Sequence, residues 1–341
     1  MHREKFIRRA LDLAVRGEGH VRPNPPVGAV VVKAGRIIGE GWHRRCGGDH
    51  AEVAAIKDAL RRAGSGGGKS LRGSEIYVTL EPCSRPGRVG ACTDAIAESG
   101  ISSVTYAVAD PNPENRGRAR RVLAAKGIDC RSFRSRCGGN SAVVEECRRL
   151  IAPFAKHVLT GLPFVTVKLA MSLDGRIADI HGDARWISSA SSRRKTGLLR
   201  ERVDAIMVGA ETVRRDDPSL LSHGKANADL VRVVVSASGD LPPDARIFTD
   251  GKNPTLVFPD PETALRELGK AGIVHVLCEG GLGLARSLAE KGLVDRWMEI
   301  LCPAVIGSRA IGDAIRMKCD SIGFSDSVAG DVEVCCRCSR A

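Results

Sequence analysis

Four residues in the first hundred have the types and spacing of a metal centre that activates water: His50, Glu52, Cys83 and Cys92. One imidazole and two thiolates supply three zinc ligands and leave a fourth position open for water. Zinc lowers the pKa of that water, so that hydroxide is available near neutral pH. Glu52 follows His50 by two residues and can carry protons without binding the metal. The pattern predicts a hydrolytic zinc site with His50, Cys83 and Cys92 as ligands and Glu52 as the catalytic residue.

The spacing of the two cysteines bears on the substrate. In zinc deaminases hydroxide attacks an amidine-like ring carbon and ammonia leaves, and those that act on nucleosides or transfer RNA usually carry a C-x-x-C motif. Here eight residues separate Cys83 from Cys92, and Pro82 is expected in the first turn of a helix that carries Cys83. A structural zinc site is the alternative, and it would need a fourth ligand, for which His43 and Cys46 are the candidates.

Length and composition indicate two domains of an ordinary globular protein. The chain has 341 residues, of which 43% are hydrophobic and 27% charged, and we expect domains at 1–150 and 151–341. The formal net charge of +12 suits phosphorylated small molecules. Seven Phe and two Tyr are few for a protein that stacks single-stranded bases, so no nucleic-acid partner is expected. With no apolar run of about 20 residues and no signal-peptide pattern, we expect no membrane partner and a cytoplasmic location.

Strands and helices alternate along both halves of the chain, which indicates α/β layered domains. In the first half the apolar run at 27–32 predicts a buried strand. Further strands are expected at 36–40, 74–80 and 104–108, with helices at 3–16, 50–62, 91–99, 117–126 and 141–154. In the second half we expect strands at 164–170, 204–209, 231–235, 255–258 and 273–278, with helices at 190–202, 261–270 and 282–291.

Five motifs of the first half carry a family resemblance: NPPVG at 24–28, GWH at 41–43, HAE at 50–52, TLEPCS at 79–84 and DPNP at 110–113. With the long insertion before Cys92, they resemble the deaminase half of the bifunctional riboflavin-biosynthesis deaminase–reductase family. The resemblance implies a cytidine-deaminase-like α/β/α layered domain that acts on 2,5-diamino-6-(5-phosphoribosylamino)pyrimidin-4-one. By matched position, Asn24 holds the pyrimidine, His43 and Arg88 lie near the ribose phosphate, and Asp110 positions the substrate.

The second half carries PFVTVKLAMSLDG at 163–175, RWISS at 185–189, VGAETV at 208–213, DDP at 216–218 and EGG at 279–281. The order of these segments resembles the reductase half of the same family, which implies a dihydrofolate-reductase-like α/β domain. In that family NADPH delivers hydride to the sugar carbon and gives a ribityl product. The resemblance places NADPH along Ala170, Trp186, Thr212, Asp216, Gly280 and Gly281. It places the substrate at Lys168, Arg200, Leu220, His223 and Glu279.

Some positions depart from the family pattern. Arginine stands at position 85, where the family has histidine, and the reductase half departs at Ala184, His223, Ser236-Ala237 and Gly283. Loss of one arginine–phosphate contact weakens binding by about 1.5–3 kcal/mol. The sequence therefore predicts a bifunctional homo-oligomeric enzyme with Zn²⁺ and NADPH as cofactors. The alternatives are a deaminase with a degenerate, structural reductase domain, which NADPH binding would distinguish, and a deaminase of nucleic-acid bases.

Overall fold

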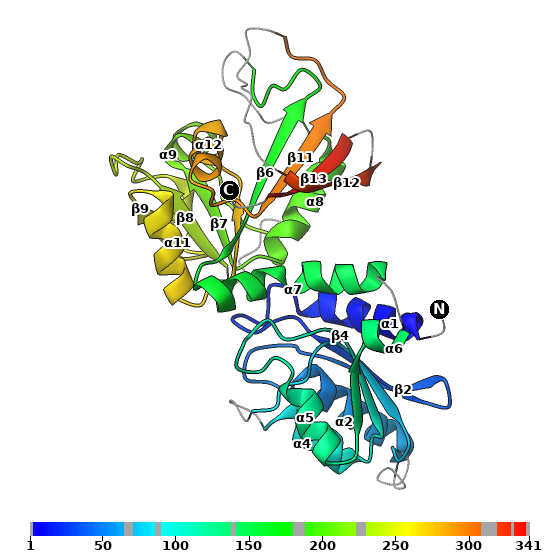
Figure 1. The fold of residues 1–341 in the computed structure, drawn as a ribbon. Helices are drawn as coiled ribbons and strands as arrows, with labels where there is room; N and C mark the ends of the chain where they lie inside the picture. Colours follow the sequence, from blue (N-terminus) through cyan, green and yellow to red (C-terminus); the bar gives the residue numbers. More distant parts are fainter. Residues whose placement is uncertain are drawn as a thin grey trace. The chain divides into compact units, whose positions relative to one another are not determined.

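The computed structural model describes residues 3–64, 71–85, 90–137, 141–179, 188–222, 230–307, 319–328 and 331–338 (Figure 1). The chain forms two compact units, Met1–Thr160 and Gly161–Ala341. The division falls later than the expected boundary at 150/151, because helix α7 (Ala142–Thr160) runs through Pro153 as one element. Its residues Val143, Val144 and Cys147 pack in a core of the first unit, so the helix belongs to that unit.

The first unit is built on a five-stranded sheet of order β2-β1-β3-β4-β5. The hairpin β1–β2 is antiparallel, β1 pairs antiparallel with β3, and β3, β4 and β5 are parallel. The strands are β1 (Gly28–Lys33), β2 (Arg36–Trp42), β3 (Glu75–Leu80), β4 (Ser103–Val108) and β5 (Asp129–Ser132). The helices are α1 (Glu4–Ala14), η1 (Val15–Gly17), α2 (Ala51–Ala63), α4 (Cys92–Ser99), α5 (Arg118–Ala125), α6 (Phe133–Cys137) and α7.

Both faces of this sheet are buried, which gives an α/β/α arrangement. Along β3, Ile76 and Val78 lie in the core shared with α2, α4 and α5, whereas Tyr77 lies in the core shared with α1 and α7. The same alternation occurs along β1. Successive side chains of a strand point to opposite faces, so a strand that is apolar throughout needs a cover on each side. The expected layered fold is confirmed.

Helix α2 lies directly on the backbone of β2. A Cβ atom at Gly39 would come within 2.5 Å of the Ala59 Cβ, and one at Gly41 within 2.6 Å of the Ala51 carbonyl oxygen. No side chain fits between the two elements, and the helix can approach the strand only because both positions are glycine. This contact fixes where α2 begins, and His50 is the residue at its N-cap.

The second unit contains an eight-stranded sheet of order β12-β13-β11-β6-β10-β7-β8-β9. The strands β11, β6, β10, β7, β8 and β9 are parallel to one another. The antiparallel hairpin β12–β13 pairs antiparallel with β11 through β13. The strands are β6 (Phe164–Ser172), β7 (Ala205–Gly209), β8 (Val231–Val235), β9 (Thr255–Phe258), β10 (His275–Cys278), β11 (Arg296–Cys302), β12 (Cys319–Val328) and β13 (Asp331–Cys338).

Helices cover both faces of this sheet as well. Helices α11 (Pro261–Lys270) and α12 (Leu282–Glu290) pack in one core, and α9 (Ala210–Asp216) and α10 (Arg246–Thr249) pack in the other. Helix α8 spans Ala190–Glu201 and contributes Leu199 beside the second core. No helix among the described residues is long and apolar enough to cross a bilayer.

Candidate active sites

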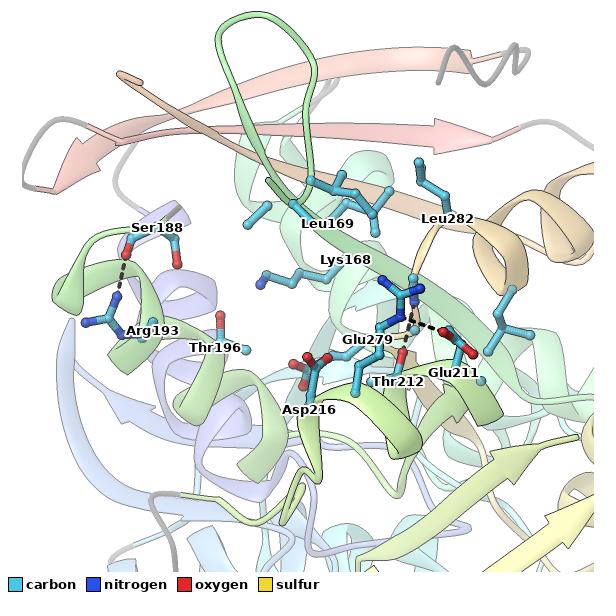
Figure 2. Close-up of a pocket in the computed structure, with 18 of the residues that line it drawn as sticks. Lys168, Leu169, Ser188, Arg193, Thr196, Glu211, Thr212, Asp216, Glu279 and Leu282 are labelled. Atoms are coloured by element: carbon cyan, nitrogen blue, oxygen red, sulfur yellow. Dashed lines mark hydrogen bonds and ion pairs between the residues drawn. The ribbon is translucent and has the colours of Figure 1, made fainter. Parts of the chain in front are cut away.

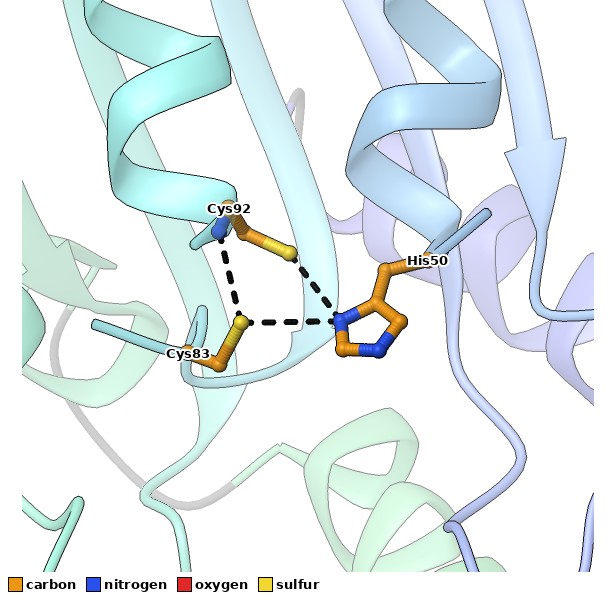
Figure 3. A group of neighbouring side chains, drawn as sticks. All are labelled: His50, Cys83 and Cys92. Atoms are coloured by element: carbon orange, nitrogen blue, oxygen red, sulfur yellow. Dashed lines mark hydrogen bonds between the residues drawn. The ribbon is translucent and has the colours of Figure 1, made fainter. Parts of the chain in front are cut away.

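Three metal-ligating side chains of the first unit converge in one group: His50, Cys83 and Cys92 (Figure 3). His50 is the N-cap of α2, Cys92 is the first residue of α4, and Cys83 follows the end of β3. Their ligand atoms all lie within 4.8 Å of one another. Within the described residues the group has three members, so the fourth ligands considered for a structural site, His43 and Cys46, do not join it.

The geometry of this group fits zinc. The Nδ1 atom of His50 lies 3.2 Å from the Cys92 Sγ and 3.5 Å from the Cys83 Sγ. In a tetrahedral site with Zn–N and Zn–S bonds of about 2.0 and 2.3 Å, the ligand atoms are about 3.5 Å apart. The Cys92 thiol and, against the effect of burial, His50 hold the pKa of Cys83 well below its usual range by hydrogen bonding. The thiolate is the form that binds zinc.

Glu52 lies in the first turn of α2 and is 3% exposed. Burial, followed by the charge of Cys83, raises the pKa of Glu52 to about 7. A carboxyl group with such a pKa can both take and give a proton near neutral pH. Glu52 is outside the ligand group, as expected for a proton carrier.

His43 and Asn24 form a hydrogen-bonded pair beside these ligands. The His43 Nδ1 lies 2.9 Å from the Asp49 carbonyl oxygen, and its Nε2 lies 3.0 Å from the Asn24 Nδ2. Because the carbonyl oxygen can only accept, Nδ1 carries the proton and Nε2 accepts from the Asn24 amide. Burial lowers the pKa of His43, which keeps the ring neutral. The ring is also edge-on to His50, at 5.2 Å between centroids, so His43 contacts both the metal ligand and Asn24.

Asp110 has both carboxylate oxygens engaged within its own loop. It accepts from the Asn112 amide N–H at 2.8 Å and from the Asn115 Nδ2 at 2.6 Å. Asn115 in turn accepts from the backbone and the hydroxyl of Ser84, both at 3.1 Å. This chain of contacts ends at the residue after Cys83, so Asp110 helps to position that ligand. Asn115 was not anticipated, since an asparagine in a Pro-rich loop carries no chemical signal of its own.

Three more residues of the sequence pattern lie in the segment around Cys83: Pro82, Arg85 and Arg88. Pro82 and Cys83 lie in irregular backbone after β3, so the expected helix carrying Cys83 is wrong. The Cys83 thiol is held instead by the Cys92 backbone N–H at 3.3 Å. Arg85 is exposed and donates to Glu114 at 2.6 Å, and Arg88 lies outside the described residues.

Replacing Cys83 by serine is expected to lower zinc affinity by at least about tenfold, because a hydroxyl is a far poorer zinc ligand than a thiolate. Metal analysis of the purified chain after dialysis measures the bound zinc. Cys137→Ser is the matched control, since Cys137 is exposed and outside the ligand group. Unchanged zinc in Cys83→Ser would remove this residue from the ligand set.

The second unit contains a cavity of about 1030 Å³ (Figure 2). It lies where β7 and β10 end and the following α9 and α12 begin, which is the usual ligand crevice of a parallel sheet. Ligand pockets have volumes of about 300–1000 Å³, so this cavity lies at the upper end of that range, as a pocket for a large ligand does. The anticipated residues that line it are Lys168, Ala170, Arg200, Thr212, Asp216, Glu279, Gly280 and Gly281.

Leu220 is placed differently from the others. Its side chain is 2% exposed and packs in the core, although its neighbours Ser219 and Leu221 line the cavity. Any contact of Leu220 with a ligand would therefore have to come from its backbone. The anticipated Trp186 and His223, and the departure at Ala184, lie outside the described residues.

A half-buried charged pair, Arg200 and Glu279, lies on the cavity wall. Arg200 donates to both carboxylate oxygens of Glu279, at 2.7 and 2.9 Å, and to the Leu221 carbonyl oxygen at 3.0 Å. Burial alone would raise the pKa of Glu279, but the charges of Arg200 and Lys168 lower it below its usual value. Burial lowers the pKa of Lys168, and the charge of Glu279 opposes this effect. The three side chains form one electrostatic unit.

The segment between β10 and α12 fits the phosphates of a dinucleotide. Gly281 is the N-cap of α12, and its backbone N–H lies 3.3 Å from the Thr212 Oγ1. A Cβ atom at Gly280 would come within 2.9 Å of Leu284, whereas one at Gly283 would meet nothing within 4 Å. The backbone is thus open to a ligand at Gly283, near the start of the helix, where amide groups favour anions. The departure at Gly283 removes a side chain from this wall. At the departure Ser236-Ala237, the Ser236 hydroxyl accepts from the Gly239 N–H.

Comparison with known proteins assigns a family to each unit. Residues 1–108 match the cytidine and deoxycytidylate deaminase zinc-binding region, and residues 163–325 match the RibD C-terminal domain. The riboflavin biosynthesis protein RibD of Aquifex aeolicus is 33% identical over 335 residues, covering 91% of this chain and 90% of the relative. RibD of Escherichia coli is 34% identical and covers 92% and 90%.

Solved structures agree with this assignment over the whole length. A diaminohydroxyphosphoribosylaminopyrimidine deaminase/5-amino-6-(5-phosphoribosylamino)uracil reductase from Thermotoga maritima has a TM-score of 0.83 and 34% identity, covering 99% of both chains. Acinetobacter baumannii RibD has a TM-score of 0.81 at 29% identity. The expected cytidine-deaminase-like and dihydrofolate-reductase-like domains are confirmed, and the cofactors are Zn²⁺ and NADPH. This chain belongs to the RibD family and is a bifunctional enzyme of riboflavin biosynthesis, with a deaminase domain followed by a reductase domain.

Proposed function

We propose that this chain deaminates 2,5-diamino-6-(5-phosphoribosylamino)pyrimidin-4-one in its first unit and then reduces the ribosyl side chain to ribityl in its second. The observation that carries the proposal is the group His50, Cys83 and Cys92, with the buried Glu52 in the first turn of the helix that His50 caps. The Thermotoga maritima relative bears the names of both activities.

In the deamination, water adds to the ring carbon that bears the amino group, and ammonia leaves as that carbon becomes a carbonyl. Zinc held by the three ligands supplies the Lewis acidity that lowers the pKa of water. Glu52 takes the proton that water loses and passes it to the departing amino group. Its burial disfavours the charged carboxylate, which suits a group that has to take up a proton and hold it for the second transfer. Asn24 presents its amide oxygen to the pyrimidine because His43 accepts from its Nδ2.

In the reduction, the opened ribosylamino group has a double bond between the sugar carbon and the amine nitrogen. When bound, NADPH would supply hydride to that carbon, and the nitrogen would take a proton to leave a single bond. We assign this proton to Lys168, whose ammonium is made more acidic by burial. Arg200 and Glu279 bind the substrate beside it, and Thr212, Asp216 and the Gly280-Gly281 segment bind the cofactor.

The substrate partner is a small phosphorylated pyrimidine, and we further propose a homo-oligomer in the cytoplasm without nucleic-acid or membrane partners. The net charge of +12 favours an anionic substrate. Light scattering on the purified chain measures the oligomeric state, and a molar mass of one chain would contradict this part.

A coupled assay tests the proposed function. The purified chain receives the diaminopyrimidinone ribosylamino phosphate, with and without NADPH, while ammonia release and NADPH absorbance are followed together. Ammonia release followed by NADPH oxidation is the expected result. Ammonia release without NADPH oxidation would contradict the proposed reduction, and no ammonia release would contradict the proposed substrate.

A further inference from the structure

The segment between α9 and β8 has an unusual backbone. Asp217 has φ of 38° and Leu220 has φ of 51°, and neither residue is glycine. A left-handed conformation is unfavourable for such residues, and it persists only where the surroundings hold it. The turn at Leu220 sends its own side chain into the core and places Ser219 and Leu221 on the cavity wall. The shape of this wall therefore depends on whatever fixes the turn.

The contacts that fix the turn come from behind the wall. Arg232, the second residue of β8, is 1% exposed and is not a lining residue of the cavity. Its Nη1 donates to the Ser219 carbonyl oxygen at 3.3 Å and to Asp250 at 2.7 Å. Its Nη2 donates to the other oxygen of Asp250 at 3.0 Å and to the Asn253 carbonyl oxygen. One guanidinium thus ties the turn to the end of α10 and to the loop after it.

The turn continues directly into the charged pair of the cavity. The Leu221 carbonyl oxygen, two residues beyond Ser219, accepts from Arg200 at 3.0 Å, and Arg200 holds Glu279 in a two-point contact. A shift of the Ser219–Leu221 segment would move the acceptor that helps to aim Arg200. The cofactor-side residues Thr212 and Asp216 belong to α9, which Arg232 does not contact by any described hydrogen bond.

We propose that Arg232 is a positioning residue of the reductase site, which holds the Ser219–Leu221 turn and through it aims Arg200 and Glu279 at the pyrimidine substrate. The inference rests on the proposed function of the second unit. Only a planar guanidinium group, with its several N–H donors, can reach the Asp250 carboxylate and two backbone carbonyl oxygens together. Lysine, with one compact ammonium group, can keep the charge next to Asp250 but not all of these contacts.

Kinetics of Arg232→Met and Arg232→Lys test the proposal. In Arg232→Met we expect the KM for the deaminated pyrimidine to rise at least tenfold, with the KM for NADPH within twofold of wild type. Arg232→Lys should recover part of the loss. The deaminase activity of the same chain should stay unchanged in both variants, because the first unit has its own cores.

A stability control separates positioning from simple damage. Leu265→Ala empties part of the core below α11, away from the turn, and should lower the Tm without changing the KM for the pyrimidine. Equal rises of KM in Leu265→Ala and Arg232→Met, or a wild-type KM in Arg232→Met, would overturn the proposal.

Hydrogen exchange without any ligand gives a readout independent of the substrate. The amides of 217–222 should exchange at least tenfold faster in Arg232→Met than in wild type, and at an unchanged rate in Leu265→Ala. Unchanged exchange at 217–222 in Arg232→Met would overturn the inference even if the enzyme is active. A wild-type chain that oxidises no NADPH in the coupled assay would instead contradict the proposed reduction, and the exchange data would still decide what Arg232 holds.

Discussion

Glu52→Gln is expected to lower the deamination rate by about 10²–10⁴-fold, the usual contribution of a positioned acid–base group. The amide fills nearly the same buried volume as the carboxyl group but can no longer take the proton that water loses. Zinc content should stay at the wild-type level, because Glu52 is not one of the three ligands. Ammonia release measures the rate, and metal analysis measures the zinc.

Two controls accompany this variant. Glu98→Gln changes an exposed glutamate of α4 in the same unit and should leave the rate unchanged. NADPH oxidation with added deaminated substrate should also be unchanged, because that reaction belongs to the second unit. Deamination at the wild-type rate in Glu52→Gln would show that another group carries the proton, and loss of zinc would show that Glu52 supports the ligands.

Glu279→Gln is expected to lower the reductase rate by roughly 10²-fold or more and to lower the Tm. The change leaves Arg200 and Lys168 without their common counter-charge in a half-buried site. Removing one partner of a fully buried ion pair costs about 3–5 kcal/mol, because the other charge stays buried and uncompensated. The Arg200 and Glu279 side chains are 22% and 10% exposed, so a smaller cost is expected here. NADPH oxidation measures the rate, and thermal unfolding measures the stability.

The matched control for this prediction is Glu262→Gln. Glu262 forms an ion pair with Lys291 at the surface, and exposed pairs contribute about 0–1 kcal/mol. It should change neither the rate nor the Tm measurably. A Glu279→Gln variant that matches Glu262→Gln in both measurements would mean that the Arg200–Glu279 contact has no part in the reduction.

Much of the fold could be predicted because the periodicity of the sequence is strong. The apolar run of β1 and the helical spacing of α2 gave bounds within one residue of the structure. The sequence does not predict β11, because Arg296 and Glu299 interrupt its apolar pattern. It does not predict the β12–β13 hairpin either, because Cys335, Cys336 and Cys338 obscure the pattern of β13. The short helices α9 and α10 are stabilised by tertiary contacts, which a local sequence pattern does not predict.

The two sites differ in how far the sequence predicts them. Zinc chemistry requires particular residue types, so His50, Cys83 and Cys92 could be selected before their positions were known. The reductase wall is assembled from side chains spread between Lys168 and Gly281, and only the family resemblance selected them. The one signal for Arg232 was an arginine inside the run Val231–Val235, where a buried parallel strand would be apolar throughout.

The bare contact between α2 and β2 has a consequence for how this enzyme can evolve. At Gly39 and Gly41 the helix backbone and its alanines occupy the space of any side chain. A change of rotamer cannot accommodate a larger residue at either position, because the clash is already at the Cβ atom. Such a residue would have to displace the whole helix, together with His50 and Glu52. Glycine is therefore the residue type that fits at these two positions, and substitutions in the deaminase half have to occur at other positions.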